Sequence, residues 1–307
     1  MIYEYAIEPD LAVEWGKNRA DYRYFLEKFS LGSPRIMAEF PKFKNWRKQF
    51  KQAAASADET KELPLITEIF TMLKERHIHR NSFNYDGTLS WLENAELENT
   101  RQQFQAILSR TNPRHHAKVL ASNTVDTNPF WRVEKQASCP RRANDMAKLL
   151  APMLVNCLEI HFIDPHFGPE NLRHRKPLEA FLNIIAKRPS CRPKIDKIVI
   201  HTSGKADFDF FKQNCEEKLR AIIPAGICLI LQRWNQWEGG EKLHERYILS
   251  DIGGLKVDPG LDDGKQGESF EVLLLERNLY EKHWGNYVTN PAFERAEDPI
   301  EIIGPKG

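Results

Sequence analysis

Residues 143–290 alternate short apolar runs with longer amphipathic segments, and this alternation constrains the fold more than any other feature of the chain. The apolar runs have the length of buried strands, whereas the longer segments repeat their apolar residues at helical spacing. Strands that alternate with helices predict an α/β domain with a mixed, largely parallel sheet flanked by helices. We expect strands at Leu158–Ile163, Lys197–Thr202, Ile227–Gln232, Lys242–Ser250, Leu255–Val257 and Phe270–Leu275, and helices at Asp145–Asn156, Glu170–Lys187, Asp207–Ile223 and Leu279–Val288.

Residues 1–115 have a different character and are expected to form a mostly helical N-terminal domain. One short strand is predicted at Ile2–Ile7, and helices are predicted at Leu11–Phe29, Phe43–Ala55, Leu63–Glu75 and Leu89–Leu108. Three tryptophans are expected to anchor the core, because buried aromatic rings contribute strongly to a small core: Trp15, Trp46 and Trp91. A linker is predicted at residues 116–142, the α/β domain at residues 143–290, and a C-terminal tail at residues 291–307.

Charge and cysteine content argue against several classes of protein. The formal net charge is +1, so binding to nucleic acid would require a local basic patch rather than the overall charge. The five cysteines are widely spaced without a CxxC pair, which argues against a zinc site or a disulfide framework and favours reduced thiols in the cytoplasm. The chain has no apolar run of about 18 residues and no signal-like N-terminus, so neither secretion nor a membrane span is expected.

A local basic patch does occur between Arg35 and Lys51, where basic and aromatic residues are interleaved. The simpler interpretation is an amphipathic helix whose basic face is solvated. The alternative is a face that docks nucleic acid or a partner protein.

The segment Lys242–Asp251 carries the polar pattern with the clearest chemistry, in the order His-x-Arg-x4-Asp. Its members are His244, Arg246 and Asp251. If the segment is a strand, side chains two residues apart share one face, so His244 and Arg246 point the same way. An imidazole beside a fixed cation suits nucleophilic attack on a phosphate, and it equally suits passive phosphate binding.

The pattern resembles the HxKx4D motif of the phospholipase D superfamily, with arginine in place of lysine. Residues 160–167, IHFIDPHF, are similar to the strand ending in DPYF that recurs in those domains. Residues 253–263, GGLKVDPGLDD, resemble the glycine-bearing strand and turn that follow the motif. The likeness is stronger to single-motif domains, such as the C-terminal domain of MIT-domain proteins. It covers about residues 140–290 and implies a phospholipase D-like fold there.

The resemblance implies a phosphodiesterase or nuclease that works through a phosphohistidine, without a metal or another cofactor. It assigns His244 as the nucleophile or the acid and Arg246 as the clamp on the phosphoryl oxygens. Asp251 is then a candidate support, and Gly260 is expected to approach the phosphate.

The same mechanism needs a second imidazole, but the chain contains only one copy of the motif. A homodimer could bring two copies of His244 together. Alternatively, His201 or His166, at the predicted ends of strands, could supply the second acid or base, whereas mid-strand His161 is interpreted as a core residue. Glu271 is a candidate for orienting His244, a task that a carboxylate often performs.

Arginine in place of lysine preserves phosphate binding more surely than catalysis, because a guanidinium binds phosphate in a bidentate manner. The expected function is therefore binding of phosphodiester or nucleic-acid phosphate, extended to metal-independent cleavage if a homodimer forms. The alternative is an inactive scaffold that binds a partner protein or an anionic lipid; a membrane is the less expected partner, since the net charge is near zero. Small chains that pair a helical region with a phospholipase D-like domain also resemble accessory proteins of bacterial anti-phage loci.

Overall fold

The computed structural model describes residues 1–305 and divides the chain into two compact units. The N-terminal unit comprises Ile2–Glu134 together with Ser190–Pro193. The C-terminal unit comprises Lys135–Pro189 and the chain from Lys194 onward. Each unit has its own sheet.

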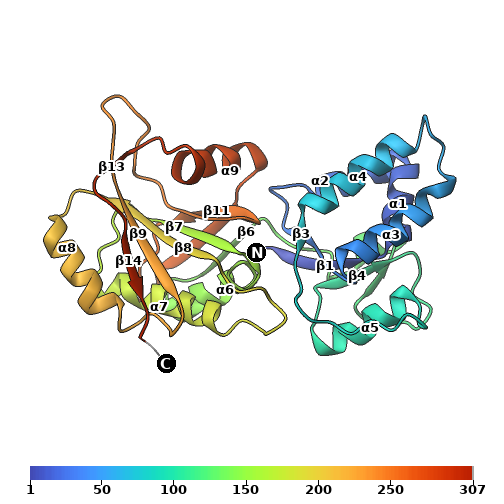
Figure 1. Cartoon of the computed structure of the whole chain (residues 1–307), viewed down its shortest axis with the longest axis horizontal. Coiled ribbons are helices and arrows are strands. Elements are labelled where there is room, and N and C mark those ends of the chain that lie inside the picture. Colours follow the sequence, from blue (N-terminus) through green and yellow to red (C-terminus); the bar gives the residue numbers. More distant parts are fainter. Residues whose placement is uncertain (306–307) are drawn as a thin grey trace. The chain divides into compact units, whose positions relative to one another are not determined.

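The N-terminal unit is built on a parallel sheet of five short strands, in the order β3-β2-β1-β4-β5 (Figure 1). Its strands are β1 (Tyr3–Ile7), β2 (Arg35–Ala38), β3 (His77–Ile78), β4 (Ala106–Ser109) and β5 (Val119–Ala121). Its helices are α1 (Pro9–Lys17), α2 (Arg19–Phe29), α3 (Phe43–Ala53), α4 (Leu63–Glu75) and α5 (Trp91–Arg101), with short 3-10 turns at Ala54–Ser56 and Val125–Thr127. This strand order is that of doubly wound α/β folds.

The expectation of a mostly helical N-terminal domain missed this sheet. The strands β2 to β5 have only two to four residues each, too few for their spacing to identify them. The predicted helix Leu11–Phe29 is two helices, because Asn18 ends α1 and its side chain caps α2 through the backbone N–H of Ala20 at 2.8 Å. The predicted helix Leu89–Leu108 stops at Arg101, and its last residues belong to β4.

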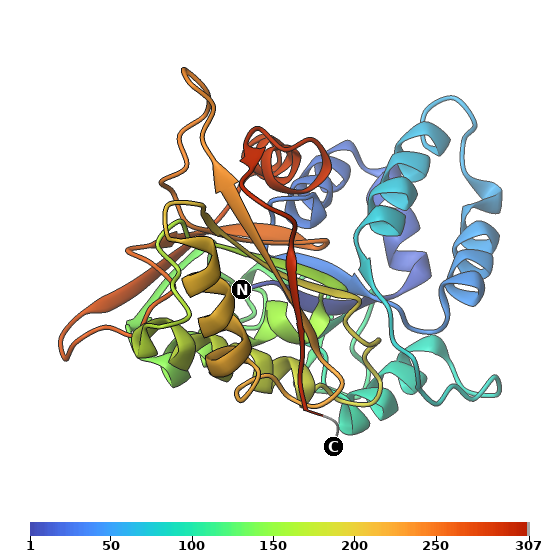
Figure 2. The same cartoon turned by 60° about the vertical axis from the view of Figure 1, so that its left-hand side comes forward.

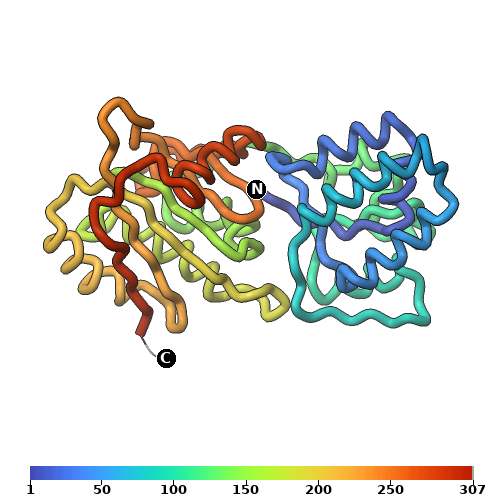
Figure 3. The backbone as a smooth tube through the Cα atoms, turned by 45° about the horizontal axis from the view of Figure 1, so that its top comes forward, coloured from blue at the N-terminus to red at the C-terminus, as the bar shows by residue number. Residues whose placement is uncertain are grey.

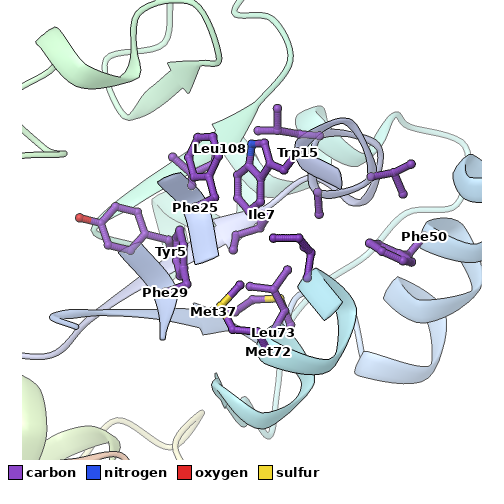
Figure 4. Close-up of a cluster of buried hydrophobic side chains, with 14 of the residues drawn as sticks. Tyr5, Ile7, Trp15, Phe25, Phe29, Met37, Phe50, Met72, Leu73 and Leu108 are labelled. Atoms are coloured by element: carbon purple, nitrogen blue, oxygen red, sulfur yellow. The ribbon is translucent and has the colours of Figure 1, made fainter. Parts of the chain in front are cut away.

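The predicted tryptophan anchors are confirmed, since Trp15, Trp46 and Trp91 are all buried. Trp15 stacks on Phe25 at 3.9 Å in the cluster that packs α1 to α4 against one face of the sheet (Figure 4). Trp91 belongs to a second cluster, which packs α5 against the other face. In α3, Trp46 and Phe50 turn inward while the basic residues stay at the surface, as the amphipathic interpretation expected.

The C-terminal unit contains a nine-stranded mixed sheet, in the order β13-β9-β8-β7-β10-β11-β12-β6, with β14 also paired to β9 (Figure 2). Its strands are β6 (Gln136–Pro140), β7 (Glu159–Ile163), β8 (Lys197–Ser203), β9 (Cys228–Asn235), β10 (Tyr247–Ser250), β11 (Gly253–Asp258), β12 (Ser269–Leu274), β13 (Glu294–Arg295) and β14 (Ile300–Ile303). Its helices are α6 (Ala143–Asn156), α7 (Leu172–Ala186), α8 (Phe208–Asn214) and α9 (Arg277–Trp284), and π turns follow α8 at Cys215–Leu219 and α9 at Gly285–Thr289.

A mixed sheet flanked by helices was predicted, but the expectation that it is largely parallel was wrong. Only β7, β8 and β9 run parallel, through helical crossovers, and the other pairings are antiparallel. The physical reason is the short connections from β10 to β11 and from β11 to β12, which allow only antiparallel neighbours.

Helices cover both faces of this sheet, with α6 and α7 on one face and α9 on the other (Figure 1). Alternate side chains of β7 contact the two layers: Phe162 stacks on Phe181 of α7 at 5.5 Å, and His161 meets the edge of Trp284 of α9 at 5.5 Å. The last strand, β14, returns to pair with β9, so residues 291–307 are not simply a tail (Figure 3).

The predicted linker at residues 116–142 also carries structure. It contains β5 of the N-terminal sheet and β6 of the C-terminal sheet, and the units divide after Glu134. Among residues 1–305, every helix is too short or too polar to cross a membrane.

Candidate functional site

A polar pocket of about 220 Å³ lies at the carboxyl end of β7, where ligands commonly bind in open α/β sheets. Segments from five parts of the C-terminal unit converge on it: the ends of β6, β7 and β11, the start of α7, and the residue before β10. The lining residues are Arg141, Asp164, His166, Arg173, His174, Arg246, Pro259, Gly260 and Asp262.

Asp164 is the structural centre of this pocket. Its carboxylate accepts the backbone N–H of His166 at 3.0 Å and that of Leu261 at 3.1 Å, and it is almost fully buried. These two bonds hold the turn after β7 against the loop after β11. Asp164 therefore shapes the pocket and also contributes a negative charge to it.

Asp262 holds two of the three arginines that line the pocket. Its carboxylate bonds the guanidinium of Arg141, and its other oxygen lies 3.5 Å from Nε of Arg173. Arg141 also reaches Glu268, at 3.3 Å. The charges of Arg141 and Arg173 are thus partly satisfied within the protein.

Arg246 differs from the other two arginines, because no carboxylate binds it closely. Its nearest acidic partner is Asp164, with 3.9 Å between Nε and Oδ1. Nε is buried and has no hydrogen-bond partner within residues 1–305, while 29% of the side chain is exposed. Because Arg246 lines the pocket and part of its side chain is exposed, its guanidinium can bind an external acceptor.

Two histidines line the same pocket. His166 is exposed at the turn after β7. His174, in the first turn of α7, is buried, and its Nδ1 lies 3.0 Å from the backbone nitrogen and 3.3 Å from the carbonyl oxygen of Gly168. These contacts fix the His174 ring against the turn after β7.

Gly260 lies where a side chain would fill the pocket. A Cβ atom there would stand 2.9 Å from Oδ1 of Asp262 and 3.4 Å from Oδ2 of Asp164. The glycine therefore keeps the space between the two carboxylates and the arginines open.

His244 is not among the residues that line the pocket. The strand expected to start at Lys242 starts at Tyr247, which pairs with Ile163, the last residue of β7. With no partner strand beyond that point, His244 lies in a turn with 60% of its side chain exposed, 3.5 Å from Glu245. The expectation that His244 and Arg246 share a strand face is therefore wrong.

The structure does not bring Asp251 or Glu271 to this pocket either. Asp251 follows β10 at the opposite end from Arg246, and its carboxylate accepts the backbone N–H groups of Leu158 and Glu159, at 2.8 and 3.1 Å. Burial raises its pKa even so. Glu271 is exposed on β12. Asp251 therefore ties the start of β7 to the end of β10.

His201 lies on the other face of the sheet, within a buried chain of hydrogen bonds. Nε1 of Trp234 lies 2.9 Å from Nδ1 of His201, whose Nε2 lies 2.7 Å from Nδ1 of His161. His161 in turn contacts Glu159 through Nε2 at 2.8 Å, and Lys197 reaches the same carboxylate. An indole N–H can only donate, so His201 accepts at Nδ1 and donates at Nε2, and His161 then donates to Glu159.

This chain of bonds requires both imidazoles to be neutral. Burial lowers the pKa of His201 well below its ordinary value and also lowers that of His161. The hydrogen bond from His161 lowers the pKa of Glu159 to about 2. His161 is thus the satisfied core histidine that was predicted, and buried His201 belongs with it rather than with Arg246.

Comparisons of the chain with models of protein families, with curated proteins and with solved structures find no match. The phospholipase D-like assignment therefore depends on the motifs quoted above and stays a prediction.

Proposed function

We propose that the pocket at the end of β7 binds a phosphate group of a nucleic acid or another phosphodiester. The observation that carries the proposal is the guanidinium of Arg246, which lines the pocket and whose Nε has no hydrogen-bond partner among residues 1–305. Arginine forms bidentate, charge-assisted hydrogen bonds to phosphate oxygens.

The remaining lining residues support an anionic ligand over a cationic one. Three arginines face two aspartates, and Asp262 already engages Arg141 and Arg173. One positive charge is then left over, beside the exposed ring of His166. Gly260 keeps room for a group larger than water.

Replacing Arg246 by glutamine is expected to weaken binding of a fluorescently labelled single-stranded oligonucleotide by about 10- to 100-fold. Hydrogen bonds to a charged group contribute about 1.5–3 kcal/mol, which corresponds to that range. Fluorescence anisotropy at low salt measures the dissociation constant, and affinity of the wild type should fall as salt rises.

The matched control is Arg277→Gln, which makes the same chemical change in an exposed ion pair with Glu281 on α9. This variant should bind the oligonucleotide as the wild type does. Equal affinities for the Arg246 and Arg277 variants, with both proteins folded by circular dichroism, would remove the support for this pocket.

His166 favours a second candidate function, metal-independent phosphodiester cleavage. Its exposed ring lines the pocket that contains Arg246, so one chain offers a cation and an accessible imidazole together. In the mechanism that the resemblance implies, an imidazole nitrogen attacks phosphorus as the bond to the leaving oxygen breaks, and a second imidazole protonates that oxygen. Water then breaks the phosphorus–nitrogen bond and releases the phosphate.

We expect cleavage of labelled DNA or RNA in the presence of EDTA, and at least about a 100-fold loss in His166→Ala with oligonucleotide binding retained. The matched comparison is His244→Ala, which removes an exposed histidine outside the pocket. Loss of cleavage only in the His244 variant would favour the homodimer that pairs two copies of this residue. Binding without cleavage by the wild type would favour an inactive scaffold.

A further inference from the structure

A second constellation lies in the N-terminal unit, at the carboxyl ends of β2 and β3. Glu39, His77 and His79 each offer a ligand atom there, and these atoms all lie within 4.8 Å of one another. We infer that these three residues bind a divalent transition-metal ion of the zinc class. The inference is independent of the proposed phosphate site, since none of the three belongs to the C-terminal unit.

The strand register brings the three side chains together. β2 and β3 are parallel, with Met37 opposite His77 and Ala38 opposite Ile78, so Glu39 and His79 follow as the next neighbours. Residues two apart on an extended segment share a face, which places both histidines on the side that Glu39 also occupies.

Hydrogen bonds already orient two of the ligands. Nδ1 of His77 lies 2.7 Å from the carbonyl oxygen of Lys74, so it carries the proton and leaves the Nε2 lone pair for a metal. Oε1 of Glu39 accepts the backbone N–H of Phe43 at 3.0 Å, while Oε2 faces Nδ1 of His79 at 2.8 Å. Metal-binding histidines and carboxylates commonly have such outer partners, which fix the ring and the carboxylate.

The ligand types select the class of metal. Two imidazoles and one carboxylate suit Zn²⁺ and its neighbours in the first transition row, whereas Ca²⁺ and Mg²⁺ prefer oxygen ligands alone. Three protein ligands leave at least one coordination position for water or a small ligand. His79 is 53% exposed, so an ion can reach the cluster, and the ring of Phe43 packs against His77 at 4.9 Å and forms one wall.

The full-length protein, stripped with EDTA and desalted, is expected to bind one Zn²⁺ per chain at this site. Isothermal titration calorimetry with Zn²⁺ measures the affinity, and Co²⁺ gives a visible absorption band that reports the coordination. His79→Ala and Glu39→Gln should each weaken Zn²⁺ binding at least about tenfold and remove the Co²⁺ band.

The control is His115→Asn, which removes an exposed histidine outside the cluster. Asparagine tolerates the positive φ of 52° at this position, so the backbone is preserved. This variant should bind Zn²⁺ as the wild type does.

Because the His79 side chain is largely exposed, His79→Ala tests the site without disturbing the core. Zn²⁺ affinity that is equal in the wild type, His79→Ala and Glu39→Gln would overturn the inference, and so would the absence of binding by the folded wild type. In either case the contact between Glu39 and His79 would be only a surface ion pair.

Discussion

Replacing Glu4 by glutamine is expected to lower the free energy of unfolding of the N-terminal unit by about 3–5 kcal/mol. Glu4 lies in the central strand β1, where its buried carboxylate accepts Arg80 at 2.7 Å and Arg192 at 2.8 Å. Burial alone would raise the pKa of Glu4, but the hydrogen bonds from Arg192 and the charge of Arg80 outweigh it and lower the pKa. Glutamine removes the charge and turns an N–H group toward two buried guanidinium groups.

Hydrogen–deuterium exchange resolved by peptides measures this loss, because it reports β1 separately from the C-terminal unit. The same substitution at Glu27, an exposed residue paired with neighbouring Lys28, should change stability by less than about 0.5 kcal/mol. If both variants exchange at the rate of the wild type, the network around Glu4 does not stabilise the unit.

The C-terminal unit is expected to lose stability as the pH falls below about 6.5. Its buried pair His161 and His201 is neutral when folded, and burial holds the pKa of His201 well below the ordinary 6.5. Below that pH the unfolded chain takes up protons that the folded state excludes, so acid favours unfolding. Glu159 adds to this loss of stability at lower pH, because its pKa in the folded state, about 2, lies below the ordinary 4.5. The stabilisation that its carboxylate provides is lost as the pH falls from 4.5 to about 2.

Between about pH 7.5 and pH 5.5, the buried neutral His201 should lower the free energy of unfolding by on the order of 1 kcal/mol, and His161 contributes in the same direction. Urea unfolding at each pH, followed by a brief deuterium pulse at one fixed pH, measures the change in peptides from β7 and β8. His201→Asn should reduce this pH dependence, since the amide oxygen still accepts the indole N–H of Trp234 and does not titrate. The exposed control His115→Asn should keep it, and equal pH dependence in all three proteins would contradict a neutral buried pair.

The two candidate sites occupy comparable places on different sheets. The phosphate pocket follows β7, and the proposed metal cluster follows β2 and β3, in both cases at the carboxyl ends of parallel strands. Loops at that edge converge from neighbouring strands, which makes it a common location for ligand sites.

Much of the C-terminal unit could be predicted from local periodicity. The strands β7, β8, β9 and β12 and the helices α6, α7 and α9 lie within a few residues of their expected positions. The shorter elements of the N-terminal sheet escaped detection, because two to four residues show no reliable alternation. The strand Lys242–Ser250 was too long by five residues at its start, since alternation continued past the point where β7 ends.

The candidate site was predictable only in part. Arg246, Gly260 and His166 were singled out from the sequence, and all three line the pocket. Arg141, Arg173 and His174 were missed, because they stand in the loop after β6 and in the first turn of α7 and form no motif. Their only signal was position next to the end of a predicted element. Asp262 lies in the quoted stretch 253–263 but was given no role.

The sequence by itself determined most of the longer helices and the strands of the C-terminal unit, because apolar spacing is a local property of the chain. It also identified the arginine before β10 and the aspartate after β7 as neighbours of a candidate site. Only the tertiary structure decided that Asp251 and His201 lie elsewhere, that Asp262 engages two arginines, and that Arg246 keeps an unpaired donor. The physical reason is that strand order and ion pairing depend on residues far apart in the chain, and periodicity carries no information about them.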